Sequence, residues 1–415
     1  MGKSIFEGLK VADFTAAIAG PLAMRFLACE GATVVKVECH RHPDPVRLVV
    51  PYKDMVPGID RSVQFAFYNY SKYSVSLDIG RPLGQDIARR LIEWSDVLME
   101  NMAPGSMEKW GLDYESVRKV KPDIIYLSSS SLGRTGPLSA YAAWGYHHGP
   151  LVGFSHITGW PDRLPCGDAI AYTDSVAPSF SVIALIGALL YRRRTGKGVY
   201  IDQSQTEAGA YFLGPTVMDY LVNGRIAKRQ GNRDPYMVPH GIFPCSGEDR
   251  WVALAVSNQE EWERFCRALK KEGWLQAERF TTIMARKSNE DELENLISAW
   301  TAQRSPEEVV GLLQSAGVPA GVVVTSEDLF QDPQLKHREH FKKLEHQEVG
   351  AYSYELPSMR FSKMPHQPQR PAPLLGEHTE HVLKDLLGYT DDEIAEFLIQ
   401  GVITTDDDIP EVGSL

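Results

Sequence analysis

The residue best suited to chemistry is Asp174, which lies directly before a long apolar stretch. Its neighbourhood reads Ala171-Tyr172-Thr173-Asp174-Ser175-Val176-Ala177-Pro178, and an apolar, helix-forming run follows. A carboxylate in this position is close to the amides of a helix N-terminus, which are expected to hold it ionised. An ionised aspartate can attack an activated acyl carbon and form a covalent acyl intermediate. The alternative is that Asp174 only caps the helix, a common use of aspartate.

Size, composition and charge indicate a globular protein with more than one domain. The 415 residues exceed what a single hydrophobic core usually organises, so two domains are expected. A hydrophobic content of 43% and a charged content of 23% are ordinary for a globular protein. The net charge of −11 argues against nucleic acid or an anionic membrane as a partner, so an anionic ligand would need a local basic pocket.

The cysteine spacing, the N-terminal residues and the length of the longest apolar run predict a cytoplasmic protein without a metal site. The five cysteines are odd in number and lack the CxxC spacing of a zinc site, which favours reduced thiols. The N-terminal residues 1–6 contain no signal-peptide core. The longest apolar run, residues 176–191, contains Pro178 and Gly187 and is too short to span a bilayer. It is therefore expected to be a buried helix.

The first half of the chain repeats a strand–helix–strand pattern. Residues 9–14 predict a strand, Gly20-Pro21 begins a helix that Gly31 ends, and residues 33–37 predict a second strand. Two strands joined by one helix are expected to lie parallel. Further strands are expected at 74–77, 97–99, 124–127 and 199–201.

Beyond residue 225 the pattern changes, which predicts a smaller inserted domain. A polar turn at 229–235 leads to a strand at 251–256, charged helices over 258–315 and a strand at 318–324. A C-terminal helix pair closes the chain, with Thr390 and Glu393 predicted as a capping box for the second helix. We therefore expect an α/β fold with a large domain in residues 1–224 and 326–415, interrupted by a small α/β domain in residues 225–325.

The first strand–helix turn does not predict a dinucleotide site. Residues 15–21 lack the GxGxxG pattern, and Glu38 alone, at the end of the second strand, is weak evidence for ribose binding. A helix N-terminus at this turn is still a suitable place for a phosphate group.

Many short segments, in one shared order over nearly the whole chain, resemble the class III CoA-transferase family. That group includes formyl-CoA, carnitine and succinyl-CoA:benzylsuccinate CoA-transferases. Two examples are Gly133-Arg134-Thr135-Gly136-Pro137 and Pro373-Leu374-Leu375-Gly376-Glu377-His378-Thr379. The other matching segments are 8–15, 19–21, 31–38, 72–78, 100–105, 111–112, 171–178, 194–198 and 231–233.

The resemblance implies a fold, a partner and a chemistry. It implies a large Rossmann-like domain built from both chain ends, a smaller inserted domain, and two subunits threaded through each other as interlocked rings. The family's catalytic aspartate falls on Asp174, which would form an aspartyl-CoA thioester. No metal and no permanently bound cofactor is expected, because CoA thioesters are the substrates. Gly133, Gly136 and Gly145 are candidates for letting backbone amides approach the oxyanion.

The resemblance also implies the residues that bind CoA. By family position these are Ile18, Lys72, Asn101, Met102, Lys109 and Arg134, with Arg41 in place of a charge that relatives carry where this chain has Cys39. Ile18 stands where formyl-CoA transferase has a glutamine, which argues against that substrate. For each basic residue the alternative is an ordinary surface charge.

The acceptor pocket is expected to include Tyr146, His147, Tyr236 and His240. Aromatic side chains and a methionine around the site favour a bulky, aromatic acid as acceptor, and succinyl-CoA is the expected donor. The alternative is that these side chains belong to the hydrophobic core. They are Trp144, Tyr146, Tyr172, Phe180, Tyr236, Met237 and Phe243.

Two other functions stay open at this stage. The fold also hosts α-methylacyl-CoA racemases, in which a histidine and an aspartate exchange an α-proton, here His147 and Asp174. A glycine run follows the aspartate in racemases, whereas Ser175-Val176-Ala177-Pro178 follows it here. The third possibility is a non-catalytic subunit of a heteromeric CoA-transferase, although such a subunit would usually lack Asp174.

Overall fold

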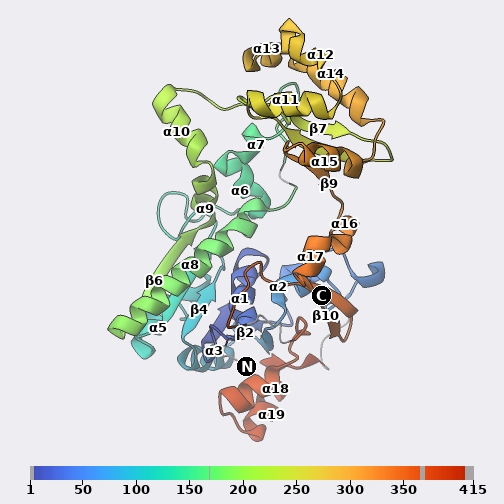
Figure 1. The fold of residues 1–415 in the computed structure, drawn as a ribbon. Coiled ribbons are helices and arrows are strands. Elements are labelled where there is room, and N and C mark those ends of the chain that lie inside the picture. The colour runs from blue at the N-terminus through green and yellow to red at the C-terminus, as the bar shows by residue number, and fades with distance from the viewer. Residues whose placement is uncertain (1–3, 168, 365–369, 407–415) are drawn as a thin grey trace. The chain divides into compact units, whose positions relative to one another are not determined.

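The computed structural model describes residues 4–167, 169–364 and 370–406. They form a mixed α/β fold with one large, mostly parallel sheet, which confirms the predicted class (Figure 1). The chain divides into two compact units. Unit 1 comprises residues 1–155, 167–226 and 337–415, and unit 2 comprises residues 156–166 and 227–336.

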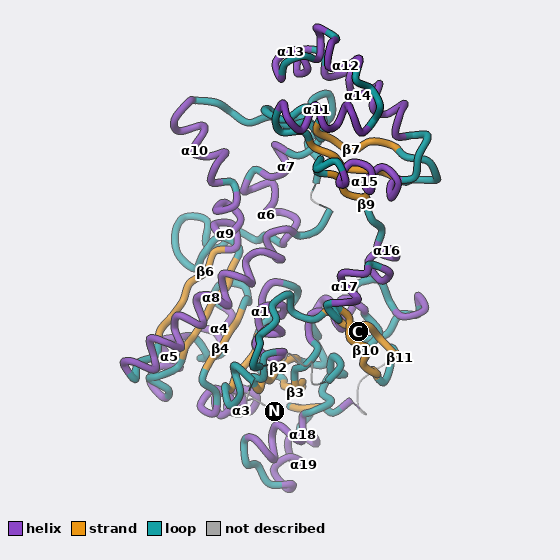
Figure 2. Tube along the Cα trace, in the orientation of Figure 1, coloured by secondary structure: helices purple, strands orange, loops and turns teal. Residues whose placement is uncertain are grey.

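The sheet of unit 1 has seven strands, drawn in orange in Figure 2. All neighbours pair in parallel except β12, which is antiparallel to β3. The order reverses at β1, with β2 on one side and β4 on the other, and such a switch point is where open α/β sheets bind ligands. In spatial order the strands are β12 (Ile403–Thr404), β3 (Tyr73–Leu77), β2 (Thr33–Glu38), β1 (Lys10–Phe14), β4 (Val97–Glu100), β5 (Ile125–Ser130) and β6 (Val199–Ser204).

Helices cover both faces of this sheet. The helices of unit 1 are α1 (Ala19–Cys29), α2 (Val63–Asn69), α3 (Pro82–Trp94), α4 (Ser106–Lys109), α5 (Tyr114–Val120), α6 (Gly145–Val152), α7 (Phe154–Ile157), α8 (Tyr172–Thr195), α9 (Gln205–Phe212), α10 (Gly214–Asn223), α18 (Thr379–His381) and α19 (Asp391–Ile399). A hairpin of β10 (Phe341–His346) and β11 (Gly350–Glu355) forms a separate small sheet. The capping box of Thr390 and Glu393 is present at α19, as predicted.

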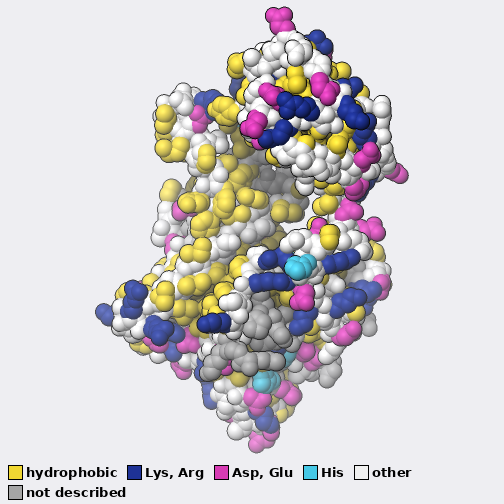
Figure 3. Space-filling view, in the orientation of Figure 1, with side chains coloured by type: hydrophobic (Ala, Val, Ile, Leu, Met, Phe, Trp, Pro, Cys, Tyr) yellow, Lys and Arg dark blue, Asp and Glu magenta, His cyan; other side chains and the backbone are white. Residues whose placement is uncertain are grey.

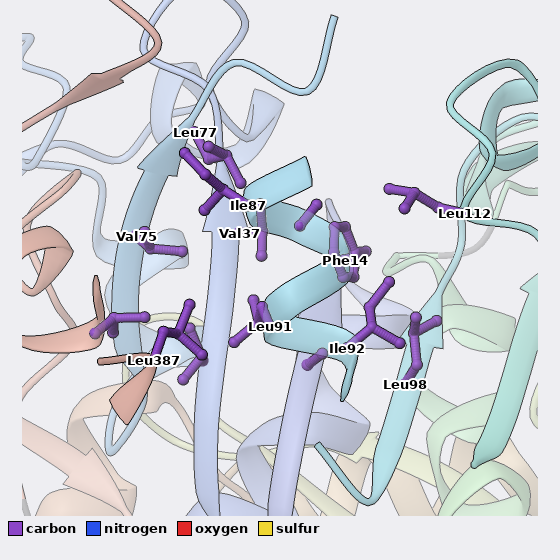
Figure 4. Close-up of a cluster of buried hydrophobic side chains, with 14 of the residues drawn as sticks. Phe14, Val37, Val75, Leu77, Ile87, Leu91, Ile92, Leu98, Leu112 and Leu387 are labelled. Carbon is purple, nitrogen blue, oxygen red and sulfur yellow. The ribbon is translucent and has the colours of Figure 1, made fainter. Parts of the chain in front are cut away.

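Alternate strand residues build two different cores. Val11 and Val34 belong to the core under α1 and α8, whereas Ala12 and Val35 belong to the core under α3. Figure 4 shows the second core, in which strand side chains meet three residues of α3, namely Ile87, Leu91 and Ile92. Because successive strand side chains point to opposite faces, a sheet covered on both sides has the near-continuous apolar strands seen in this sequence.

The segment with the family motif 373–379 holds the chain end against the sheet edge. The amide of Gly376 donates to Ser74 Oγ at 3.1 Å, and the amide of Ser76 donates to Thr379 Oγ1 at 3.1 Å. Gly376 has a positive φ of 78°, and a Cβ there would press on the carbonyl oxygen of Thr404. The motif therefore has a structural use, since it satisfies polar groups of β3 and brings the C-terminal residues to the sheet of the N-terminal ones.

Unit 2 is a three-stranded antiparallel sheet with helices on one face. Its strands are β7 (His240–Pro244), β8 (Trp251–Ala255) and β9 (Ala320–Val323), in that order. Its core contains Trp262, Phe265 and Phe280. Its helices are α11 (Gln259–Ala268), α12 (Gly273–Gln276), α13 (Ile283–Ser288), α14 (Glu290–Thr301), α15 (Pro306–Ser315), α16 (Ser326–Gln331) and α17 (Pro333–His337).

The helix predicted over residues 176–191 is present, but the expectations that it is too short to span a bilayer and that it is buried were wrong. The helix α8 runs over 24 residues and includes Pro178. In the described part of the chain it is the single helix that is long and apolar enough to cross a membrane, although the core helix of a globular protein passes the same test. Leu185 is fully buried, whereas Ile183 is 66% and Leu190 is 50% exposed. One face of α8 packs on the sheet, and an apolar face is left uncovered in the single chain.

Candidate active site

Asp174 lies in the first turn of α8 and is only 8% exposed. Its Oδ2 atom faces Gly145, the first residue of α6, so closely that a Cβ atom on residue 145 would overlap the carboxylate. Its Oδ1 atom lies 4.0 Å from Nδ1 of His148. The N-cap position of α8 is Ala171. Asp174 is therefore a buried carboxylate between two helices, and the alternative that it is the cap residue was wrong.

The electrostatic expectation for Asp174 was also wrong. The sequence led us to expect that the helix amides would keep the carboxylate ionised, but burial raises the pKa of Asp174 to about 7. Removing the carboxylate from water disfavours its charged form more than the helix terminus favours it. A desolvated carboxylate that is half ionised near neutral pH is a more reactive nucleophile than a hydrated one.

Replacing Asp174 by asparagine is expected to stabilise the protein at high pH only. The folded-state pKa of about 7 lies above the ordinary value of 3.8, so this carboxyl group destabilises the fold increasingly as the pH rises from about 4 to about 7. We expect Asp174→Asn to raise the apparent free energy of unfolding by about 4 kcal/mol above neutral pH and to change it little near pH 4. Urea unfolding at both pH values measures this, with exposed Asp162→Asn as the control. An equal gain at both pH values would contradict the explanation.

The two adjacent histidines have different environments. His147 is exposed, and its Nδ1 atom accepts a hydrogen bond from the amide of Trp144 at 3.1 Å, at the start of α6. His148 is 2% exposed, and its Nδ1 atom lies 3.1 Å from Thr173 Oγ1. Proton carriers on opposite faces of an α-carbon must be about 6 Å apart, two hydrogen-bond lengths, whereas His148 and Asp174 are 4.0 Å apart. This geometry disfavours His148 and Asp174 as a racemase pair, and the predicted pair of His147 and Asp174 stays a prediction.

A cavity of about 580 Å³ opens where β1, β2 and β3 end, beside the switch point of the sheet. Its apolar lining includes Met102 and Trp110, and its cationic lining includes Arg41 and Arg81. The Arg41 and Arg81 guanidiniums lie 3.7 and 3.4 Å from the Asp78 carboxylate. The remaining lining residues are Phe14, Thr15, Ala16, Lys36, Val37, Glu38, Cys39, His42, Pro43, Asp44, Pro45, Leu77, Ile79 and Gly80.

Asn101 shapes this cavity by holding the loop between β1 and α1. Its Oδ1 atom accepts a hydrogen bond of 2.7 Å from the amide of Ala16, and its Nδ2 atom donates one of 2.8 Å to the carbonyl of Ala16. The next residue, Ala17, has a positive φ of 63°, and its amide donates to Asp44 at 3.1 Å. Ile18, the N-cap of α1, ends the loop. Both polar atoms of Asn101 are thus engaged by backbone, which places its role in the loop that lines the cavity.

Three predicted CoA-binding cations do not line this cavity. Lys72 is fully buried, and its ammonium group lies 2.9 Å from both Asp13 and Asn69. Arg134 pairs with the buried Glu100 and lines a smaller cavity of about 240 Å³. Lys109 is exposed at the end of α4. The expectation that Lys72 presents its charge to a ligand was wrong, because its charge is already matched inside the protein.

The predicted acceptor residues fall into both units. Tyr146 on α6 is 62% exposed, and Tyr236 in unit 2 is 70% exposed. His240 in unit 2 makes a hydrogen bond of 2.7 Å between its Nδ1 atom and the carbonyl of Asn232. Phe243 is a core residue of unit 2, so the expectation that it lines a substrate pocket was wrong.

Several residues at these sites had not been predicted from the sequence. Tyr68 on α2 is half-buried, and burial together with the nearby Asp174 carboxylate raises the pKa of its hydroxyl. Lys36 donates to the carbonyl of Thr15 at 2.8 Å and pairs with Asp44 at 2.9 Å beneath the cavity. Arg81 precedes the first turn of α3 and carries no recognisable motif. Within the described residues there is no group of three or more His, Cys, Asp or Glu side chains that could hold a metal ion.

Comparisons with known proteins agree on one family. The chain matches CoA-transferase family III over residues 6–379. The succinyl-CoA:glutarate CoA-transferase of Mus musculus is 32% identical over 96% of this chain and 90% of that protein. The succinyl-CoA–D-citramalate CoA-transferase of Chloroflexus aurantiacus is 29% identical over 96% of this chain and 98% of that protein. The crystal structure of a CaiB/BaiF family protein from Brucella suis has a TM-score of 0.85 at 32% identity, covering 93% of this chain and all of that one.

Fold and site together define an α/β enzyme with a desolvated carboxylate and a nucleotide-sized cavity in the same unit. The chain belongs to CoA-transferase family III and is a CoA-transferase that acts on acyl-CoA thioesters and carboxylic acids.

Proposed function

We propose that this enzyme transfers CoA from succinyl-CoA to a carboxylic acid through an aspartyl-CoA thioester on Asp174. The observation that carries the proposal is the position of Asp174, which is buried in the first turn of α8 against the backbone of Gly145. Only a glycine at position 145 leaves room for Oδ2 in this place, since a Cβ atom there would overlap it. Succinyl-CoA is the proposed donor because both relatives described above are named as succinyl-CoA-dependent transferases.

The chemistry conserves the energy of the thioester. A carboxylate oxygen of Asp174 attacks the acyl carbon of the donor, which gives a mixed anhydride and releases CoA thiolate. The thiolate attacks the aspartyl carbon, which gives the aspartyl-CoA thioester and releases succinate. The acceptor carboxylate then attacks the aspartyl thioester, which gives a second mixed anhydride and releases CoA thiolate. The thiolate attacks the acceptor acyl carbon, which gives the new acyl-CoA and expels the Asp174 carboxylate. Asp174 is regenerated at the end of each cycle.

The cavity at the ends of β1 to β3 suits the nucleotide end of CoA. Its apolar residues, among them Ile79, Met102 and Trp110, offer surface for an adenine ring. Its cations Arg41 and Arg81 suit phosphate groups, because guanidinium binds phosphate through two parallel hydrogen bonds. The lining also carries the carboxylates Glu38, Asp44 and Asp78, so in this assignment a phosphate group competes with Asp78 for the two guanidiniums.

We further propose that two copies of this chain form the enzyme, as interlocked rings in the cytoplasm. The supporting observation is an exposed apolar surface on α8, α9 and α10, where Figure 3 shows hydrophobic side chains gathered. Exposed members include Ile183, Tyr211, Leu221 and Val222, each at least 66% exposed. A continuous apolar surface of this kind is typical of a face that another protein covers.

The acceptor is proposed to be a bulky, aromatic acid. Trp144, the N-cap residue of α6, and Tyr146 flank Gly145 and are both more than 60% exposed, so they are available to a substrate. Tyr172 packs edge-on against Phe154 and Phe212, which extends the aromatic surface along α8 and α9. A screen in which only small acids such as formate accept CoA would contradict this acceptor class.

Intact-protein mass spectrometry tests the covalent route. After incubation with succinyl-CoA and trapping with hydroxylamine or borohydride, we expect a modification at Asp174 that is missing from Asp174→Ala. Native mass spectra of the same samples should show a dimer. An unmodified wild-type enzyme that still transfers CoA would exclude the aspartyl intermediate.

A further inference from the structure

The two oxygen atoms of Asp174 have different surroundings. Oδ2 faces the Cα atom of Gly145, where no side chain intervenes. Oδ1 faces the imidazole of His148, with Nδ1 at 4.0 Å. His148 is itself fixed, because it is 2% exposed and its Nδ1 atom lies 3.1 Å from Thr173 Oγ1. The carboxylate thus has one oxygen against the backbone of Gly145 and the other near the imidazole of His148.

The environment of His148 indicates which ring nitrogen carries the proton. Its Nε2 atom is buried and has no hydrogen-bond partner among the described residues. A proton on Nε2 would be a buried donor without an acceptor, which is costly. A proton on Nδ1 has Thr173 Oγ1 and Asp174 Oδ1 as acceptors. Burial also lowers the pKa of His148 to about 4, so the ring is neutral at pH 7 and has a single N–H, which we assign to Nδ1, the nitrogen with acceptors nearby.

We propose that His148 is a catalytic residue that donates Nδ1–H to Oδ1 of Asp174 and stabilises the oxyanion formed there, so that Oδ2 alone is the attacking oxygen. This inference rests on the proposed covalent route through Asp174. The separation of 4.0 Å in the free enzyme shortens as negative charge develops on Oδ1.

The proposal assigns a fixed course to each atom. Oδ2 bonds to the donor acyl carbon and forms the bridging oxygen of the anhydride. When CoA thiolate attacks the aspartyl carbon, the electron pair moves onto Oδ1, facing His148, and returns as Oδ2 departs within the released carboxylate. The acceptor then attacks the same carbon, the charge again appears on Oδ1, and an acceptor oxygen becomes the new Oδ2. Oδ1 is never replaced.

A heavy-oxygen experiment measures this asymmetry directly. The enzyme turns over many times with succinyl-CoA and with an acceptor acid whose two carboxylate oxygens are both the heavy isotope. Mass spectrometry of the peptide that contains Asp174 then counts the heavy atoms on its side chain. One heavy oxygen is the expected result. Two would show that the carboxylate rotates between cycles, which overturns the role of His148 but keeps the covalent route. None would overturn the proposed function itself.

Substitutions of His148 separate its chemical role from packing. An asparagine places an N–H near the position of Nδ1, whereas a glutamine places it near Nε2. We expect His148→Ala and His148→Gln to lower kcat by about 100-fold, as for loss of one oxyanion donor, and to acquire two heavy oxygens. The kcat of His148→Asn should remain within about tenfold of the wild-type value, and its Asp174 should acquire one heavy oxygen. Equal losses in the asparagine and glutamine variants would contradict the proposal, and thermal unfolding of each variant shows whether it is folded.

Discussion

A single methyl group added at Gly145 is expected to reduce CoA transfer by about 100- to 1000-fold without unfolding the protein. The Cβ atom of an alanine at this position would overlap Oδ2 and Cγ of Asp174 and would also meet the Cβ atom of Ala171. Either the carboxylate rotates away or the start of α6 moves. Both changes displace the attacking oxygen, and misplacing a reacting atom by about 1 Å can cost 100-fold in rate.

The measurement for Gly145→Ala is the steady-state rate of CoA transfer together with the yield of the trapped adduct at Asp174. The matched control is Gly311→Ala in α15, where a Cβ atom would meet nothing within 4 Å. That variant should transfer CoA at the wild-type rate and gain slightly in stability, because alanine favours a helix over glycine. Thermal unfolding should show about 1–3 kcal/mol of destabilisation for Gly145→Ala from overpacking. Wild-type activity in Gly145→Ala would mean that Asp174 reacts from another orientation.

The main elements of the fold were predictable because they follow from local patterns. Residues 9–14 and 33–37 were predicted as parallel strands, and β1 and β2 pair in parallel as expected. Hydrophobic periodicity, a helix-starting Gly20-Pro21 and a helix-ending Gly31 are signals carried by neighbouring residues. The position of Asp174 at the start of a helix was predictable for the same reason.

The surroundings of Asp174 were not predictable, because they depend on contacts between distant segments. Gly145 and His148 belong to α6, which is short and carries Pro150 within it, so its residues gave no clear helical pattern. The sequence placed His147 and His148 near the site but could not tell which of them faces the carboxylate. That choice depends on a rotation of about 100° per residue around the α6 axis, set by packing against α8 and α9. Likewise, burial sufficient to raise the pKa of Asp174 arises only when the helices are packed.

The cations of the CoA cavity illustrate a second limit. Lys36 and Lys72 both follow the pattern of a lysine near a strand of the sheet, and the sequence does not distinguish a buried lysine from an exposed one. In the structure both are fully buried and paired with carboxylates, Lys36 with Asp44 and Lys72 with Asp13. The cations that line the cavity at its surface are instead Arg41 and Arg81, which both lie near the Asp78 carboxylate. Charge pairing across segments decides which cations remain available.

Removing the buried charge of Lys72 is expected to lower the apparent free energy of unfolding by about 3–5 kcal/mol. Asp13 is fully buried, and Lys72 Nζ lies 2.9 Å from its Oδ2 atom. In Lys72→Ala the carboxylate of Asp13 still accepts a hydrogen bond of 3.0 Å from the amide of Thr15. It loses its only ion-pair partner among the described residues. A buried charge without a counter-charge is among the largest single destabilising effects known for point variants.

A double-mutant cycle distinguishes this structural role from CoA binding. Asp13→Asn with Lys72→Met removes both charges and keeps similar volumes, so it should be more stable than either single variant. The exposed Lys109→Ala should change stability by less than about 0.5 kcal/mol. If Lys72 instead served a CoA phosphate, Lys72→Ala would raise the KM for the acyl-CoA and leave the unfolding midpoint unchanged. The buried pair predicts a lower unfolding midpoint and an unchanged KM. The lysine charge acts on Asp13 beneath the loop that carries Thr15 and Ala16. Loss of this support therefore lowers the fraction of folded enzyme before it changes the affinity for substrate.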